Sequence, residues 1–233
     1  MKIDNESLSY IKNVVDTAQM IGIDGVVIEP GKVRAMHEDK TVVMFQDENV
    51  PEMPFTAVGL NRLSVFAARL DVAKTMDKFA IDVKTNDNSE FARSFTMTGK
   101  GFKVDYRCAN PKTIIAPQKI NDEMIYKIEL TPEAVYLLQR GQTAMGADVV
   151  SLICNSDGVT FELQDVNSDK FSHTFTDEVE KMDGADDSFT YKYPIKVLLP
   201  LFKENAENVF EIGKKGMLRI TVNNITLFIL PQV

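Results

Sequence analysis

The chain has 233 residues, which at roughly 150 residues per domain allows one large domain or two small ones. Its apolar fraction of 44% and charged fraction of 26% are ordinary for a folded globular protein and exclude a disordered, collagen-like or fibrous chain. The 26 basic residues against 34 acidic ones give a net charge of −8, so the surface as a whole should repel nucleic acid and anionic membranes.

The first 110 residues predict two repeats of a helix followed by a sheet. Apolar residues recur at helical spacing over 5–19 and again over 61–75, where Leu63 and Leu70 share a face. Between the helices, turn residues such as Pro30 and Gly31 separate short stretches of β-branched and aromatic residues. Strands are expected where β-branched and aromatic residues gather, at 25–31, 32–38, 40–47, 54–60, 79–85, 91–99 and 102–110.

The second half repeats this pattern. One helix is expected over 131–146, with Pro132 in its first turn and Gly146 at its end, and another over 195–205, which Pro200 should kink or shorten. Asn223 and the asparagine after it suit a hairpin turn. Further strands are expected at 124–130, 148–155, 158–165, 171–177, 188–194, 208–214, 216–223 and 225–231. The acidic segment 178–188 is expected to be a solvated loop.

The segment between the halves holds two prolines and no tight turn signal, so we expect an extended linker. The expected domains are 1–110 and 123–233, joined by a connector over 111–122. The fold class is therefore α+β, with a fourfold structural pseudo-repeat in which two helices of each half pack on one side of antiparallel sheets.

Basic residues gather on the expected helices, whereas acidic residues crowd the loops and strands. Arg62 and Arg69 are seven residues apart, and Lys196 and Lys203 repeat that spacing. Any one such cation is most simply a solvated helix face. As a set inside an acidic protein, they would present one attractive surface to a polyanion.

Three stretches resemble the DNA sliding clamps of tailed phages and, more distantly, proliferating cell nuclear antigen. KTIIAPQKI (112–120) is similar to the clamp's interdomain connector, and ITLFILPQV (225–233) is similar to its last strand. RAMHEDKTVVMF (34–45) resembles the early hairpin of these clamps. The order of strand, helix and three strands in all four repeats agrees with the resemblance.

The resemblance implies the DNA clamp fold and a homotrimeric ring whose helices line a hole that holds double-stranded DNA. Weak phosphate contacts that read no base edge would permit sliding, while encirclement retains the protein. Among the cations, Arg69 and Lys203 have the best helical phase, and Lys74 falls toward the apolar side. The expected DNA-facing residues are Lys12, Arg62, Arg69, Lys74, Lys78, Arg140, Lys196 and Lys203.

Two further surfaces follow from the same resemblance. Strands 102–110 and 171–177 would pair edge to edge between subunits, through Phe102, Val104, Tyr106, Phe171, His173 and Phe175. A hydrophobic pocket would hold the C-terminal peptide of a DNA polymerase or clamp loader. Its expected lining is Met36, Val42, Ile114, Ile115, Ala116, Pro117, Phe228, Ile229, Leu230 and Pro231. For Ile229 and Leu230, a buried strand explains the sequence equally well.

Catalytic and metal-binding patterns are weak. His37 and Glu38 begin a zincin-like motif, but Thr41 stands where the second histidine is needed. The loop from Asp165 lacks the glycine and final glutamate of a calcium loop, and no phosphate-binding, dinucleotide or nucleophile-elbow motif occurs. We therefore expect a binding protein that is not an enzyme and has no cofactor or metal. A monomeric or dimeric polymerase accessory factor of the same fold is the second hypothesis, and an unrelated enzyme with a β-rich fold is the third.

Cysteine usage and hydropathy indicate the compartment. Cys108 and Cys154 form no CxxC pair and supply neither a disulfide framework nor a four-ligand zinc site. No stretch approaches the roughly 18 apolar residues of a membrane span, and the N-terminus is mostly polar. The expected location is the cytoplasm, that of the host cell if a phage encodes the chain.

Overall fold

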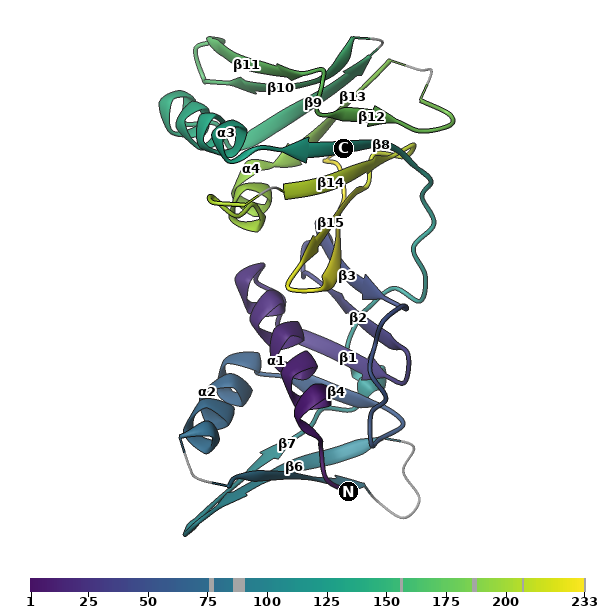
Figure 1. Ribbon diagram of the computed structural model, residues 1–233, viewed down its shortest axis with the longest axis vertical. Helices are drawn as coiled ribbons and strands as arrows, with labels where there is room; N and C mark the ends of the chain where they lie inside the picture. Colours follow the sequence, from purple (N-terminus) through teal and green to yellow (C-terminus); the bar gives the residue numbers. More distant parts are fainter. Residues whose placement is uncertain (76–77, 86–90, 156, 186–187, 207, 233) are drawn as a thin grey trace. The chain divides into compact units, whose positions relative to one another are not determined.

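The computed structural model describes residues 1–75, 78–85, 91–155, 157–185, 188–206 and 208–232. The chain forms two compact units, one of Met1–Ile120 with Asn223–Ile225 and one of Asn121–Val222 with Thr226–Val233 (Figure 1). No helix in the described ranges is long and apolar enough to cross a membrane.

The first unit contains two helices and seven strands among its described residues. α1 packs against α2 and β1, and α2 packs against β6 and β7. In chain order the elements are α1 (Asn5–Met20), β1 (Gly25–Glu29), β2 (Lys32–Met36), β3 (Val42–Gln46), β4 (Val58–Asn61), α2 (Leu63–Lys74), β5 (Ala80–Thr85), β6 (Ala92–Gly99), β7 (Phe102–Arg107) and the 3-10 turn η1 (Pro111–Thr113).

The second unit has the same kind of architecture. α3 packs against β8, β10 and β11, whereas α4 packs against β9 and β13. In chain order the elements are β8 (Met124–Leu130), α3 (Pro132–Met145), β9 (Val149–Asn155), β10 (Gly158–Gln164), β11 (Lys170–Phe175), β12 (Val179–Lys181), β13 (Phe189–Pro194), α4 (Ile195–Leu198), the 3-10 turn η2 (Leu199–Leu201), β14 (Asn208–Gly213), β15 (Leu218–Val222) and β16 (Ile225–Ile229).

Each unit contains two antiparallel arrays. In the first unit the strand orders are β3-β2-β1-β4 and β5-β6-β7, and in the second they are β12-β8-β14-β15-β16 and β11-β10-β9-β13. The order of strand, helix and three strands recurs four times along the chain. In the first repeat the leading strand is only a bridge between Lys2 and Asp82. The expected pseudo-repeat is therefore present.

Local signals fixed several element ends. The Thr131 side chain accepts a hydrogen bond from the main-chain N–H of Ala134 and caps α3, whose C-cap Gly146 has a left-handed φ of 58°. Asn223 and Asn224 have φ values of 52° and 63°, as the two central residues of a type I′ hairpin turn require.

Aromatic side chains pack against one another in the core of each unit. In the first unit, Phe66 of α2 contacts Phe95 and Tyr106, with ring centroids 5.7 and 5.0 Å apart. In the second unit, Phe161 contacts Phe175 at 5.1 Å and Phe210 at 5.8 Å. These contacts fix α2 over β6 and β7, and they tie β10 to β11 and β14.

The fourth helix is shortened, as expected from Pro200, and the structure corrects two other sequence expectations. The fourth helix is a single turn followed by η2, because Pro200 cannot donate the hydrogen bond that would continue it. Part of the supposed acidic loop is strand β12, in which Val179 pairs with Ile128 of β8; its residues 186 and 187 lie outside the described ranges. The strand expected from residue 54 begins only at Val58.

Candidate functional site

The cations of the first two helices differ in environment. Lys12 is half-buried on α1 and forms an ion pair with Asp16, one turn further along. Arg62 does not lie on the helical face where it was expected, because it precedes α2 with a left-handed φ of 51°. Its guanidinium stacks over the Tyr106 ring, with 5.5 Å between Cζ and the ring centroid.

Arg62 and Arg69 both reach the main chain of β7. Nη2 of Arg62 donates to the carbonyl of Arg107 at 3.1 Å, and Nη1 of Arg69 donates to the carbonyl of Asp105 at 2.9 Å. Because these acceptors are neutral and a guanidinium has five N–H donors, both arginines keep their charge and further donors for another ligand.

Two lysines follow the body of α2. Lys74 is its last residue and is exposed, whereas its helical phase suggested a position toward the apolar side. Lys78 is exposed beyond the helix with a φ of 58°. Both ammonium groups extend the positive charge beyond the C-terminal end of α2, which is also the negative end of the helix dipole.

The second unit places its cations less regularly. Arg140 of α3 is exposed and lies over the Tyr136 ring at 5.1 Å, and its Nε donates to the Tyr136 hydroxyl at 2.9 Å. Lys196 of α4 pairs with Asp148, with 2.6 Å between Nζ and Oδ1. Lys203 is not on a helix, because both α4 and η2 have ended before it. Lys196 and Lys203, which repeat the seven-residue spacing, therefore do not share a helical face.

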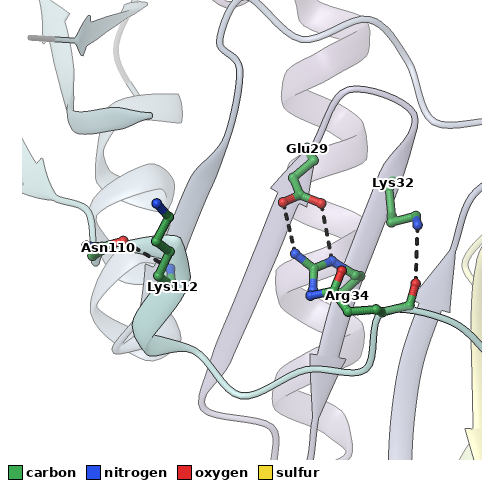
Figure 2. A network of polar contacts seen from close by, with 6 residues as sticks. Glu29, Lys32, Arg34, Asn110 and Lys112 are labelled. Carbon is green, nitrogen blue, oxygen red and sulfur yellow. Dashed lines mark hydrogen bonds and ion pairs between the residues drawn. The ribbon is translucent and has the colours of Figure 1, made fainter. Parts of the chain in front are cut away.

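Figure 2 shows two polar contacts of the connector, one local and one to the β1–β2 hairpin. At its start, the Asn110 side chain accepts from the main-chain N–H of Lys112 at 3.0 Å and caps η1. Further along, the Lys32 ammonium donates to the carbonyl of Gln118 at 3.3 Å. The segment expected to be an extended linker is thus held against the β1–β2 hairpin.

A groove of 670 Å³ opens between this connector and the sheet. Arg34 lies in its wall, 7% exposed, and its guanidinium forms a bidentate pair with Glu29 at 2.9 and 3.2 Å. The described lining residues are Glu29, Arg34, Thr56, Ala57, Phe91, Pro111, Lys112, Ile114, Ala116 and Gln118. Sequence reasoning missed the Glu29–Arg34 pair, although a charged residue in the middle of the apolar strand KVRAM was its signal.

The two connector isoleucines have opposite environments. Ile114 packs on β1 and β4, where its side chain lies 3.3 Å from the position of a Cβ on Gly25 and 3.1 Å from that of a Cβ on Gly59. Ile115 is 75% exposed. Ala116 lines the groove, and Pro117 is half-buried. Only Ile115 of the pair therefore presents its whole side chain to a partner.

Other residues expected in the peptide pocket are mostly core residues. Val42 of β3 and Ile229 of β16 are fully buried, so they support a surface from beneath and do not line an open pocket. Phe228 is also buried. The half-buried residues at these positions are Met36 in the first unit and Leu230 and Pro231 in the second.

The strands expected at subunit contacts are both sheet edges. β7 pairs only with β6, and β11 pairs only with β10, among the strands that the structure describes. The aromatic residues at the C-terminal ends of the two strands, Tyr106 and Phe175, are fully buried. The remaining expected contact residues, Phe102, Val104, Phe171 and His173, are half-buried.

Each edge strand lies beside a helix. An apolar groove of 410 Å³ runs between α2 and β7 and is lined in part by Val65, Val72 and Val104. In the second unit, the Phe171 ring of β11 lies 2.6 Å from the position of a Cβ on Gly141 of α3, so only glycine allows this close approach. Both edges thus pair with no further described strand and carry partly exposed apolar side chains, although two carbonyls of β7 accept from Arg62 and Arg69.

The described residues include no cluster of three or more potential metal ligands. Nδ1 of His37 lies 2.6 Å from Oδ1 of Asp39 in an exposed turn. Burial raises the pKa values of Cys108 and Cys154 to about 12, so both are neutral thiols near pH 7. Burial also raises the pKa of Tyr106 to about 12. None of these groups has the geometry of an activated nucleophile.

Comparison with solved structures identifies the fold. The chain is similar over 97% of its length to the PCNA of A. fulgidus, solved with the C-terminal region of FEN-1, and to the PCNA of Entamoeba histolytica. Each match covers 96% of the other chain at 13% identity, with a TM-score of 0.63. A PCNA2–PCNA3 complex from Sulfolobus tokodaii matches over 100% of this chain and 99% of the other, at 15% identity and a TM-score of 0.58.

No protein-family model matches the sequence, and no curated protein matches it at a significant level. The structural likeness nevertheless extends over almost the whole chain. The protein therefore has an α+β fold in which four helices pack on antiparallel sheets. This is the fold of the PCNA-type DNA sliding clamps.

Proposed function

We propose that this chain is a sliding clamp that closes into a homotrimeric ring around duplex DNA and tethers a replicative DNA polymerase. The full-length match to PCNA chains is the observation that carries this proposal. The two free edges, β7 and β11, support head-to-tail closure, since a strand of one copy can extend the sheet of the next. The two domains of each subunit are 1–110 and 123–233, joined by the connector 111–122.

The cations on and beside the helices would contact phosphates without reading base edges. Arg62, Arg69 and Arg140 carry the strongest support, because the groups that accept from their guanidinium groups are neutral and do not offset their charge. Lys12 and Lys196 are weaker candidates, since each already pairs with a carboxylate. Exposed Lys74, Lys78 and Lys203 add less ordered charge.

The connector region would receive the C-terminal peptide of a polymerase or clamp loader. Exposed Ile115 and the adjoining groove support this, as does the A. fulgidus PCNA, which was solved with the C-terminal region of FEN-1 bound. The protein acts without catalysis, cofactor or metal, in the cytoplasm. The connector and terminal motifs support a tailed-phage source.

The test combines mass with topology. Light scattering over a range of concentrations should approach three times the 26.1 kDa of one chain. With its loader, the protein should remain on nicked circular duplex and slide off after the circle is cut. Equal binding to cut and uncut circles would instead indicate an accessory factor that holds DNA on an open face. The hydrogen bonds to the β7 carbonyls favour this second candidate, because they occupy part of the edge that ring closure needs.

A further inference from the structure

The main chain of β7 alternates between two directions. Cys108 N–H donates to the carbonyl of Arg93 on β6 at 2.8 Å, so position 108 faces β6. In an antiparallel ladder the next residues alternate, which turns the main-chain groups of Arg107 and Asp105 away from β6. Beyond them, Ala109 N–H already donates to Gly59 of β4 at 2.8 Å. The free edge of β7 therefore ends at Arg107.

The two carbonyls at this end of the edge are the ones that accept from Arg62 and Arg69. Arg69 donates to Asp105 at 2.9 Å and Arg62 donates to Arg107 at 3.1 Å. These are successive outward-facing acceptors, two residues apart on the strand. Arg69 lies within α2, seven residues after Arg62, which precedes the helix. The left-handed backbone of Arg62 and its stack on Tyr106 hold the second guanidinium in place.

We propose that Arg62 and Arg69 hinder the pairing of another strand with the β7 edge, because their hydrogen bonds occupy two of its outward-facing carbonyls. We call this pair of hydrogen bonds the guard. A strand added to this edge directs its own N–H groups at the outward carbonyls of Asp105 and Arg107 and fills the space beside them. Self-association through β7 then has to displace both guanidinium groups. This inference rests on the proposed function, because the strand that competes is β11 of a second copy.

The guard gives the two arginines alternative partners. In the separate chain their acceptors are β7 carbonyls, and after closure their donors are free for the phosphates of the duplex. DNA binding and ring closure therefore favour each other, because each removes a competitor of the other. This reciprocity explains why two arginines expected to contact DNA bond to a sheet edge in the separate chain.

The test measures self-association of the full chain without DNA, by light scattering on dilution. The double substitution Arg62→Met with Arg69→Met keeps the aliphatic stems and removes the donors. It should lower the concentration for half-maximal association at least fivefold. The control is Lys100→Met in the exposed β6–β7 turn, which loses one positive charge without a change at the edge carbonyls. It should shift the concentration for half-maximal association less than twofold. Circular dichroism melting confirms that each variant is folded.

The guard is overturned if the double variant needs the same or a higher concentration than wild type for half-maximal association. It is also overturned if neither the wild type nor the double variant associates. A short duplex should lower the wild-type concentration for association, and no shift contradicts the coupling. Phe171→Asp on the β11 edge separates the two proposals. If it abolishes association while the arginine variants change nothing, edge pairing stands and the guard fails. If Phe171→Asp is added to an arginine variant that associates tightly and does not weaken that association, the β11 contact is wrong.

Discussion

The side chain of Ile114 lies 3.1 Å from the point where a Cβ on Gly59 would stand, so a glycine of β4 makes room for the connector. The same Cβ would meet the carbonyl of Ala109 at 2.8 Å. Gly25 of β1 is the milder case, since its Cβ would meet only the Ile114 side chain, at 3.3 Å. The path of the connector thus depends on two glycines in neighbouring strands.

Gly59→Ala should lower the free energy of unfolding by about 1–3 kcal/mol, because main-chain atoms must shift to accept the methyl group. Gly25→Ala should cost less, since a flexible side chain can give way. Urea denaturation measures both. Equal stability of Gly59→Ala and wild type, or a larger loss in Gly25→Ala, contradicts the packing described here.

The two connector isoleucines should separate stability from partner binding. Ile115→Ala should change the free energy of unfolding by no more than about 0.5 kcal/mol, as at other exposed positions, while weakening binding of a partner's C-terminal peptide. Ile114→Ala should lower stability by about 1–2 kcal/mol because it leaves a partial cavity. Denaturation and fluorescence anisotropy provide the two readouts, and the reverse pattern rules out the assignment.

Arg140 offers a test of the helix face that does not involve β7. Arg140→Ala should weaken duplex binding to a similar extent for all sequences and reduce the slope of log affinity against log salt by about 1. Lys119→Ala, an exposed cation of the connector, is the matched control and should leave that slope unchanged. A sequence-dependent loss would mean that Arg140 reads bases.

Val104 tests the β7 contact from the apolar side. Val104→Asp places a charge in the groove between α2 and β7, where burial against a second copy would be unfavourable. Self-association should be lost while the melting temperature stays within a few degrees, because Val104 is only half-buried in the separate chain. Lys100→Asp provides the control for added negative charge. Undiminished association would place the subunit contact elsewhere.

Alkaline pH should destabilise the fold in part through Cys154. Burial raises its pKa from 9.0 to about 12, so its contribution to stability is complete below pH 9 and is lost as the pH rises toward 12. In that window the unfolded chain releases a proton that the folded chain retains. Cys154→Ala should remove up to about 1.4 kcal/mol per pH unit from the slope of unfolding free energy against pH. Parallel curves for variant and wild type would contradict the raised pKa.

Several features could be predicted from the sequence because their causes are local. Helical spacing, the cap at Thr131 and the glycine at 146 place α3, and Asn223 with Asn224 specifies its hairpin turn. Pro200 by itself indicates that the fourth helix is short. The order of helical and strand periodicities along the chain was sufficient to predict the α+β class and the fourfold repeat, since each periodicity depends on residues a few positions apart.

Other features were decided by tertiary structure. Arg62 and Arg69 have suitable charge and spacing for a solvated helix face, yet their carbonyl partners lie 45 and 36 residues away in the chain. Ile114 and Ile115 are identical neighbours that differ only because Gly25 and Gly59 receive one of them. Val179 is in a strand because Ile128 of β8 offers a pairing edge. The sequence by itself determined which elements form, since caps, turns and periodicity act between near neighbours. Which side chains meet was decided by the tertiary structure, because packing brings together residues that no local pattern connects.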